Sequence, residues 1–436
     1  MEEKTPNVGV LPDSYELIGD DKDSVKDSMK RVYFEELYYA DSSVDVDSIR
    51  NENWKRYYSE HVQKAERLEM RSSETFAGGY IMANWHERGP NNEAGDIREV
   101  DFFPPTEEIY GLSSVGHLLK GTLGGNDWEI LRDDIRFSNE VLELLPQGSG
   151  KRIFAAYGEG VDNKVIRFSD DDGQTWTKGS GFMFYDHWGR GRRLYTLSDD
   201  NTLYYLVHTW SGNPWGPVIH LYKSSNKGES YSKIWDTPAG YDFEDVDLWK
   251  PHDSDQLYLV DNKAKNFLEI THDFDSGEAI FSPPVSYAGQ NVTEGSIHLS
   301  GRFNESVGAY EFFAHTSSSR NVYRTFDGAN WTYLSTVDEV VWRKGWLADP
   351  HNDNLYVGGF QLNKSADYLN WSEQYNAWWV YYSESKDYMH VDIMNLEYFE
   401  KLDGTPFILI CNHGGLHVTY DSFESTCRLS YDVDYL

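Results

Sequence analysis

Nine consecutive residues, Tyr185 to Arg193, bring together the side chains needed to remove a proton next to a carboxylate. Arginine neutralises a carboxylate through a two-point contact, and a tyrosine or histidine can then move the adjacent proton. This is the chemistry of a polysaccharide lyase, whose catalytic residues here would be Tyr185, His187 and Arg190. Ligand contacts from the same segment would be Trp188, Arg192 and Arg193. The alternative is a connecting loop whose arginines pair with surplus acidic residues.

Tryptophans in turn-rich stretches form a second set of candidates. Trp210 and Trp215 flank a Ser-Gly-Asn-Pro stretch, and Trp378 and Trp379 adjoin each other further along the chain. Because indole faces stack on sugar rings, these four tryptophans predict contacts with a glycan. Packing between neighbouring strands is the alternative for each of them.

Acidic clusters and metal-binding patterns are sparse. Asp242, Glu244, Asp245 and Asp247 could hold a general acid and base for glycoside hydrolysis, or they could form a solvated loop. The chain has only two cysteines, and no Cys/His spacing suggests zinc. Its aspartate-rich turns lack the ligand count of a calcium loop. We therefore expect no metal and no cofactor.

A repeated octet predicts the elements that must position these side chains. Ser169, Asp171, Gly173, Thr175 and Trp176 fill every position of the pattern S-x-D-x-G-x-T-W. In a tight turn between strands, the aspartate accepts backbone N–H groups and the glycine adopts a positive φ. The tryptophan anchors the strand that follows. The octet therefore predicts a structural turn.

The octet recurs along the chain at intervals of roughly 50 residues, the period of a four-stranded propeller blade. Two further copies are clear, the second one residue shorter: Ser224, Asn226, Gly228 and Tyr231, then Thr325, Asp327, Gly328 and Trp331. Weaker copies lie at 121–128, 271–273, 383–388 and 419–426. A proline-led repeat runs in phase, with strands starting at Ile109-Tyr110, Leu257-Tyr258 and Leu355-Tyr356. Together they predict an all-β fold, a seven-bladed β-propeller.

The repeat divides the chain into two parts. Residues 75–436 are predicted to form the propeller, with blades near 75–128, 129–180, 181–235, 236–282, 283–335, 336–388 and 389–436. We expect Phe76–Trp85 to pair with the last blade and close the ring, which removes exposed edges. Residues 1–74 are predicted to be an extension with a polar start and helices at about 24–40 and 48–70.

Charge and hydropathy narrow the possible partners. A formal net charge of −33 argues against nucleic acid and anionic membranes, because either requires a basic face. No stretch approaches the roughly 20 apolar residues of a transmembrane segment. Glu2, Glu3 and Lys4 follow the first methionine without an apolar run. The chain is therefore either cytosolic or a mature form whose signal peptide has been removed.

The octets resemble the Asp-box (BNR) repeats of sialidase-type, sortilin-like and xyloglucanase-type propellers. The stretch Trp85–Asn92, followed by Gly95 and Arg98, resembles the start of secreted repeat-propeller proteins of Bacteroidota, which carry a helical arm. The resemblance covers about residues 24–436 and implies an extracellular or cell-surface location. It also implies that the Asp-box turns lie away from the ligand face.

Two enzyme sites of these families match the chain poorly. A sialidase-type site clamps a carboxylate with three arginines, but its early arginine element is represented only by Arg98-Glu99-Val100. No arginine lies between Arg193 and Arg302, although Arg302, Arg320, Arg324 and Arg343 remain available for such a clamp. A xyloglucanase-type site places a catalytic aspartate where this chain has Ser114, and a serine cannot act as that carboxylate. These departures favour recognition over catalysis.

The predicted function is therefore a secreted or cell-surface recognition module that binds a glycan or peptide at the loop face of the ring. One alternative is a carbohydrate-active enzyme, either a polysaccharide lyase or a glycoside hydrolase. A second is a structural subunit of a surface complex that docks through its N-terminal arm.

Overall fold

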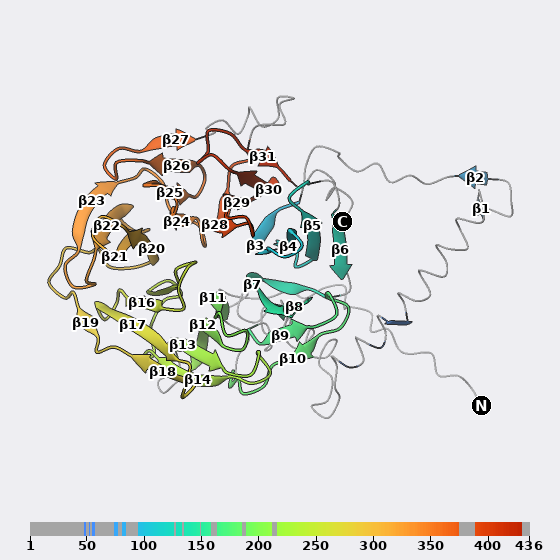
Figure 1. The fold of residues 1–436 in the computed structure, drawn as a ribbon, viewed down its shortest axis with the longest axis horizontal. Helices are drawn as coiled ribbons and strands as arrows, with labels where there is room; N and C mark the ends of the chain where they lie inside the picture. The colour runs from blue at the N-terminus through green and yellow to red at the C-terminus, as the bar shows by residue number, and fades with distance from the viewer. Residues whose placement is uncertain are drawn as a thin grey trace, which may run out of the picture. The chain divides into compact units, whose positions relative to one another are not determined.

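The computed structural model describes residues 95–125, 128–132, 135–148, 150–157, 164–184, 189–211, 216–374 and 389–429, with Ser48, Glu52, Lys55, Arg56, Glu74–Phe76 and Ile81–Ala83. Within these ranges, seven antiparallel sheets follow one another round a ring, their strands in sequence order (Figure 1). The predicted all-β, seven-bladed β-propeller is confirmed. The helical arm expected in residues 1–74 lies outside the described residues, apart from the few positions named above.

The first strand of each blade lies at the centre of the ring, against the first strands of the neighbouring blades. These inner strands are β3 (Ile97–Phe103), β7 (Phe137–Gln147), β11 (Gly189–Thr196), β15 (Val246–Trp249), β20 (Ile297–Asn304), β24 (Trp346–Ala348) and β28 (Ile393–Glu400). They surround a central channel, so their inward side chains decide what the channel can hold.

The other strands follow outwards in order. The second strands are β4 (Glu108–Ser113), β8 (Gly150–Tyr157), β12 (Leu203–Ser211), β16 (Leu257–Asp261), β21 (Ala309–Thr316), β25 (Leu355–Gly358) and β29 (Pro406–Asn412). The third are β5 (Leu118–Thr122), β9 (Ile166–Ser169), β13 (Gly216–Ser224), β17 (Asn266–Asp273), β22 (Asn321–Thr325), β26 (Leu362–Ser365) and β30 (Gly415–Thr419). The fourth are β6 (Glu129–Arg132), β10 (Thr177–Lys178), β14 (Ser232–Asp236), β18 (Glu278–Phe281), β23 (Thr332–Thr336), β27 (Ser372–Gln374) and β31 (Cys427–Arg428). Blade 4 adds β19 (Val285–Ser286), which pairs with β17.

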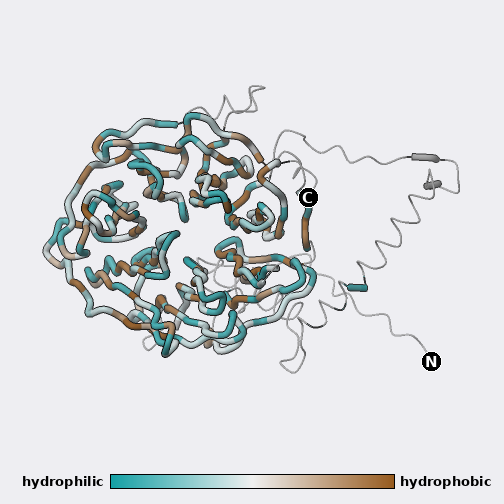
Figure 2. The backbone as a smooth tube through the Cα atoms, in the orientation of Figure 1, coloured by the Kyte–Doolittle hydropathy of each residue, from teal (hydrophilic) through white to brown (hydrophobic). Residues whose placement is uncertain are grey.

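Burial changes from the second strand to the fourth. Strands β16 and β25 are buried at every position, whereas both residues of β10 are exposed. A strand covered on both faces reads as a continuous apolar run, which is why the Leu-Tyr starts predicted the second strands correctly. Apolar segments accordingly run through the blades, between hydrophilic turns (Figure 2).

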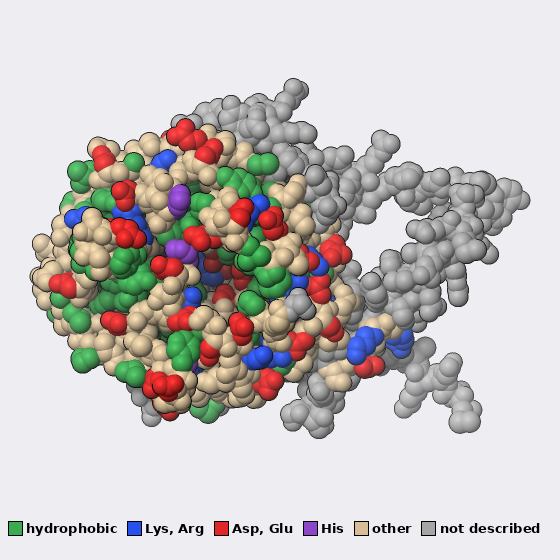
Figure 3. All heavy atoms as spheres, viewed as in Figure 1, with side chains coloured by type: hydrophobic (Ala, Val, Ile, Leu, Met, Phe, Trp, Pro, Cys, Tyr) green, Lys and Arg blue, Asp and Glu red, His purple; other side chains and the backbone are tan. Residues whose placement is uncertain are grey.

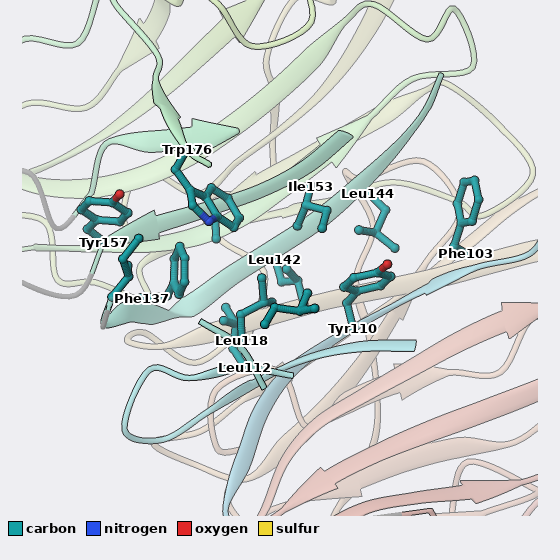
Figure 4. Packing of buried hydrophobic residues seen from close by; sticks show 13 residues of the cluster. Phe103, Tyr110, Leu112, Leu118, Phe137, Leu142, Leu144, Ile153, Tyr157 and Trp176 are labelled. Atoms are coloured by element: carbon teal, nitrogen blue, oxygen red, sulfur yellow. The ribbon is translucent and has the colours of Figure 1, made fainter. Parts of the chain in front are cut away.

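Each blade packs its apolar face against the next blade. Between blades 1 and 2, the core brings Leu118 and Tyr110 together with Phe137, Ile153 and Trp176 (Figure 4). The rings of Phe137 and Trp176 have centroids 4.6 Å apart, a tilted contact that adds to their burial. Adjacent blades therefore stabilise each other through one shared core per interface.

Ring closure also uses side-chain packing. A core between blades 7 and 1 joins Val100 and Phe102 to Leu409 and Val418. The Trp128 indole of blade 1 donates to the carbonyl of Leu429 at 2.7 Å. The predicted closing pair was wrong, because β1 (Glu74–Phe76) pairs with β2 (Ile81–Ala83) and blade 7 is completed by its own β31. The propeller strands therefore begin at Ile97, later than the predicted blade 1.

The octet at 169–176 forms the turn between β9 and β10. Ser169 Oγ accepts from the N–H of Gly173 at 2.9 Å, and Asp171 accepts from the N–H and hydroxyl of Thr175 at 2.7 and 2.6 Å. The Trp176 indole donates to the carbonyl of Gly173. The side chains thus satisfy the backbone of the turn, and we call turns of this kind aspartate turns.

The aspartate turns occupy the same place in several blades, between the third and fourth strands. The copies at 224–231, 325–331 and 419–426 form such turns, with the first hydroxyl accepting a backbone N–H in each. In blade 6 the predicted turn at 383–388 lies outside the described residues. The turn observed there is Ser365–Trp371, in which Asp367 accepts from the N–H of Asn370 at 2.8 Å. Tyr368 takes the glycine position at φ 66°, which hid this copy in the sequence.

We predict that Gly228→Ala destabilises the ring more than Gly277→Ala. Both glycines have positive φ, 78° and 70°, so either alanine should cost about 1 kcal/mol for the backbone conformation. A Cβ at position 228 would also lie 2.4 Å from Cε1 of Phe154, whereas one at 277 would meet nothing within 4 Å. Crowding in the core should add about 1–3 kcal/mol. Urea unfolding of both variants measures the difference, and equal losses would contradict this account.

Candidate functional site

The inner strands leave a polar channel along the axis of the ring. Figure 3 shows the ring hollowed at its centre, with acidic and basic side chains in the hollow. Cavities of about 690 and 400 Å³ lie towards its two ends, and one of about 60 Å³ lies between them. The cavity of about 690 Å³ and the narrow cavity share the lining residues Glu140, Arg190 and Arg343, so they lie next to each other. We call the narrow cavity the throat.

The cavity of about 690 Å³ is lined by four arginines, and we call it the arginine mouth. Arg98 lies on β3, Arg136 precedes β7, Arg190 lies on β11 and Arg343 precedes β24. All four sit where inner strands begin, at the end of the ring opposite the aspartate turns. In a chain with net charge −33, this end of the channel concentrates positive charge.

Three of these arginines differ in the protein groups that already contact their guanidinium groups. Arg343 donates to the carbonyl of Asn139 at 2.6 Å and to Glu140 at 2.5 Å. Arg98 is held by Asp96, with its Nε 2.8 Å from the carboxylate. The Arg190 guanidinium lies over the ring of Phe243, 5.8 Å from the centroid. Within the described ranges no ion pair joins Arg190 to a carboxylate, although its positive charge opposes the rise in the pKa of Glu140.

Glu140 is the acidic member of the arginine mouth. Burial raises the pKa of its carboxyl, and the positive charges of Arg343 and Arg190 offset only part of that shift. A carboxyl with a raised pKa can exchange a proton nearer neutral pH than an exposed glutamate. This end of the channel therefore holds four guanidinium groups and one carboxyl group with a raised pKa.

Arg192 and Arg193 lie deeper, where Asp247 engages both. Asp247 is fully buried, and its Oδ1 lies 3.1 Å from Nε of Arg192 and 3.0 Å from Nε of Arg193. Burial would raise the pKa of Asp247, but the two guanidinium groups hold it well below its usual range. Asp247 also accepts from the N–H of Leu299 on β20, so it links blades 3, 4 and 5. Both arginines line the throat, and their predicted ligand contacts would have to form alongside this network.

Of the other predicted catalytic and contact residues, the structure describes only Trp210. Trp210 lies at the end of β12, opposite Pro217, and is partly exposed. Outside the described residues lie Tyr185, His187, Trp188, Trp215, Trp378 and Trp379. In the sequence, the first three directly precede Gly189 and Arg190, which line the arginine mouth. Their catalytic and binding roles stay predictions.

The acidic cluster Asp242 to Asp247 was considered as a source of the two hydrolase carboxylates. Its Asp247 forms ion pairs with Arg192 and Arg193, and its Asp245 accepts from the N–H of Asp242 at 2.8 Å. Glu244 lines the throat. Burial would raise the pKa of Glu244, but His298 and Arg192 lower it overall. These carboxylates thus belong to the framework of the channel.

The opposite end of the channel carries carboxylates. Asp101, Glu143 and Glu397 line the cavity of about 400 Å³ from β3, β7 and β28. Burial raises the pKa of Glu143 to about 7, and hydrogen bonds from Thr196 limit the shift. Burial likewise raises the pKa of Asp101, which the negative charge of Glu143 reinforces. This end therefore carries both signs of charge, because Arg193, Lys250, Arg302 and Lys344 line the same cavity as these carboxyl groups.

The sequence offered Arg98 and Arg343 only as possible members of a sialidase-type arginine clamp, and it did not single out Asp101, Glu143 or Glu397. They come from four blades, and only the closed ring brings them together. Charged residues inside otherwise apolar strands, as in Arg98-Glu99-Val100-Asp101, were the available signal. An inner strand facing a channel is the place where such residues are tolerated, because water reaches them there.

Fold and channel together define a single seven-bladed β-propeller with a polar axial channel, one end of which is lined by four arginines. No family model matches the chain, and no curated protein sequence matches it. In the described ranges, no helix has the length and apolar character needed to cross a membrane. No group of three or more His, Cys, Asp or Glu residues in those ranges could hold a metal ion.

Similar solved structures are propellers at low identity. One is YCF48 from Cyanidioschyzon merolae, with TM-score 0.47 and 13% identity over 78% of this chain and 98% of that one. A mutant puromycin hydrolase complexed with PGG gives TM-score 0.51 and 10% identity over 78% of this chain and 54% of the other. An extracellular domain from B. thetaiotaomicron gives 0.48 and 11%, over 78% and 39%. The chain thus spans about half or less of the last two, and at these identities the likeness is one of fold.

We predict that Asp247→Asn is strongly destabilising. It would leave two guanidinium groups in the channel wall without their shared counter-ion, a loss of about 3–5 kcal/mol for a buried pair. The matched control is Asp338→Asn, which removes an exposed partner of Arg320 and should change stability by less than about 0.5 kcal/mol. Denaturant unfolding compares the two. A loss below about 1 kcal/mol for Asp247→Asn would show that the link is dispensable.

In wild type, the free energy of unfolding should fall as pH rises from 4.5 to about 7, and we predict that Glu143→Gln abolishes this fall. The folded state binds the Glu143 proton more tightly than the unfolded state, so this stabilisation is complete below pH 4.5 and disappears as pH rises through about 7. The difference between variant and wild type should grow by up to about 3 kcal/mol across that window. Glu373→Gln, at an exposed position on β27, is the control. Parallel stability curves for wild type and Glu143→Gln would contradict the assignment.

Proposed function

We propose that this chain is a secreted or cell-surface recognition module that binds a carboxylate-bearing glycan or peptide at the arginine mouth. One observation carries the proposal. The Arg190 guanidinium faces a cavity of about 690 Å³ with three more arginines around it, and no carboxylate of the described ranges pairs with it. In a chain with 72 acidic and 39 basic residues, such a concentration of arginine points to an anionic ligand.

The physical basis is the cost of holding like charges together. Arginines that share a cavity repel one another, and a bound carboxylate relieves that repulsion while accepting two parallel hydrogen bonds. The cavity volume lies in the usual range of ligand sites. The throat below it, at about 60 Å³, has room for about two water molecules. A carboxylate can therefore reach Arg190, while the rest of the chain stays in the mouth.

Two of the predicted aromatic contacts belong, by their place in the sequence, to the same kind of connection as one that lines the arginine mouth. Trp210 ends β12, and Trp215 follows it in the β12–β13 connection. The corresponding connection of blade 1, between β4 and β5, supplies Ser114 and Val115 to the mouth. Stacking of an indole on a sugar ring would supplement the arginine contacts. The extracellular assignment rests on the resemblance of Trp85–Asn92 to secreted propellers.

Glu140 favours a second candidate, a polysaccharide lyase or glycoside hydrolase. Its carboxyl has a raised pKa and lies beside Arg190 and Arg343, where a general acid acting on an arginine-bound uronate would be needed. Incubation with plant, algal and host polysaccharides, followed by assay of new reducing ends, separates the two. Turnover that disappears in Glu140→Gln would establish the enzyme, and binding without turnover would establish the recognition module.

We predict that Arg190→Ala weakens binding of an oligogalacturonate by roughly tenfold to a hundredfold, the loss of one charge-assisted contact. Arg320→Ala is the matched control, because Arg320 is partly exposed, pairs with Asp338 and does not line the mouth. The affinities of both variants are measured by adding increasing concentrations of protein to the immobilised oligogalacturonate. Polyglutamate serves as the peptide probe and a neutral β-glucan as the uncharged one. Equal affinity of wild type and Arg190→Ala for the acidic probes, or tight binding of the neutral glucan, would overturn the proposal.

A further inference from the structure

We infer that His413 and Asp392 position Arg98 in the arginine mouth, and that protonation of His413 strengthens binding of an anionic ligand there. The inference rests on the proposed function, because it concerns the same mouth. It rests on a separate set of contacts, however, which connects blade 7 to blade 1 across the ring closure.

The contacts form a chain of four side chains. Arg98 donates to Asp96 through Nε at 2.8 Å, and its Nη2 lies 3.2 Å from Nε2 of His413. The other ring nitrogen of His413, Nδ1, lies 3.0 Å from Oδ2 of Asp392. Asp392 directly precedes β28, and His413 lies between β29 and β30. Blade 7 thus reaches the Arg98 guanidinium through one imidazole.

Hydrogen-bond chemistry decides the protonation state of this arrangement. A guanidinium can only donate, so Nε2 of His413 must accept from Arg98. The ring proton is then on Nδ1, where it donates to Asp392. The imidazole is neutral in this state and holds Arg98 from one side, while Asp96 holds it from the other.

A second proton on the imidazole would reverse one of these contacts. Nε2–H can no longer accept from Arg98, and its nearest acceptor is Oδ2 of Asp96, 3.4 Å away. Oδ1 of Asp96 is buried and has no hydrogen-bond partner within the described ranges, so this carboxylate has an acceptor to spare. Asp96 would then be shared between Arg98 and the imidazolium. More of the Arg98 charge becomes available to the cavity, and the imidazolium adds its own.

The expected consequence is tighter binding of anions as pH falls from 8 to 5, the range in which histidine side chains change charge. His390 is the other titratable ring at this place, with its centroid 6.4 Å from that of His413. Across the mouth, protonation of Glu140 would act in the same direction, so the test must separate the two. Met394, which contacts Arg98 through its sulfur at 3.2 Å, carries no charge.

The experiment measures affinity for trigalacturonate at pH 5, 6, 7 and 8, at constant ionic strength, for wild type and three variants. The probe keeps its charge throughout, because the ring oxygen next to each uronate carboxyl withdraws electrons and makes it about as acidic as a chain-terminal carboxyl, which titrates near pH 3.5. Wild type should bind roughly tenfold tighter at pH 5 than at pH 8. His413→Gln should bind with the weaker affinity at every pH, and Asp392→Asn should reduce the pH effect. Glu140→Gln should retain most of it, and thermal unfolding confirms that each variant is folded.

A pH profile of His413→Gln as steep as that of wild type would overturn the inference while leaving the proposed function intact. Failure of wild type to bind either acidic probe would instead count against the proposed function. In that case, the contact between His413 and Arg98 can still be tested by a measurement without ligand. In protein carrying ¹³Cε1-labelled histidine, the signal lost in His413→Gln identifies the ring, and its chemical shift should change in Arg98→Ala, which removes the neighbouring guanidinium. An unchanged chemical shift would refute the contact.

Discussion

Packing of one blade against the next is the constraint on which the whole ring depends. Each described core lies between two neighbouring blades, including the one that joins blade 7 to blade 1. A single four-stranded sheet with two apolar faces cannot bury both by itself, so the blades are stable only as a closed set. Closure therefore does not require an exchanged strand. The Trp128 indole, bonded to the carbonyl of Leu429, fixes the last interface.

Closure of the ring also determines which strands can carry charged side chains. The second strands are enclosed by their neighbours and are mostly apolar, with exceptions such as Arg152 and Glu311, whereas the first strands face the axis and carry charged side chains. These charges are balanced between blades: Asp247 joins Arg192 and Arg193, and Lys344 lies 2.5 Å from Glu99. At one end of the channel four arginines and a single glutamate line the cavity, whereas at the other end carboxyl groups and basic side chains line it together.

The turn pattern shows how far local rules reach. Ser169, Asp171 and Thr175 form the hydrogen bonds that their spacing predicts, because every partner lies within one turn. The same local chemistry operates in Ser365–Trp371, but Tyr368 stands where glycine was expected, so the pattern was missed. The closing pair was misjudged for a different reason. Whether two distant segments pair depends on the rest of the ring, and no short pattern near Phe76 carries that information.

The sequence by itself determined the class of fold, the number of blades and the position of several turns, since these depend on contacts between residues close along the chain. It also pointed to Arg190, through an arginine-rich segment in an acidic chain. Only the tertiary structure decided that Arg98, Arg190 and Arg343 share one cavity, that Asp247 engages Arg192 and Arg193, and that His413 meets Arg98. The physical reason is distance along the chain. These side chains come from blades 1, 3, 4, 6 and 7, and they meet only because the inner strands of a closed ring converge on one axis.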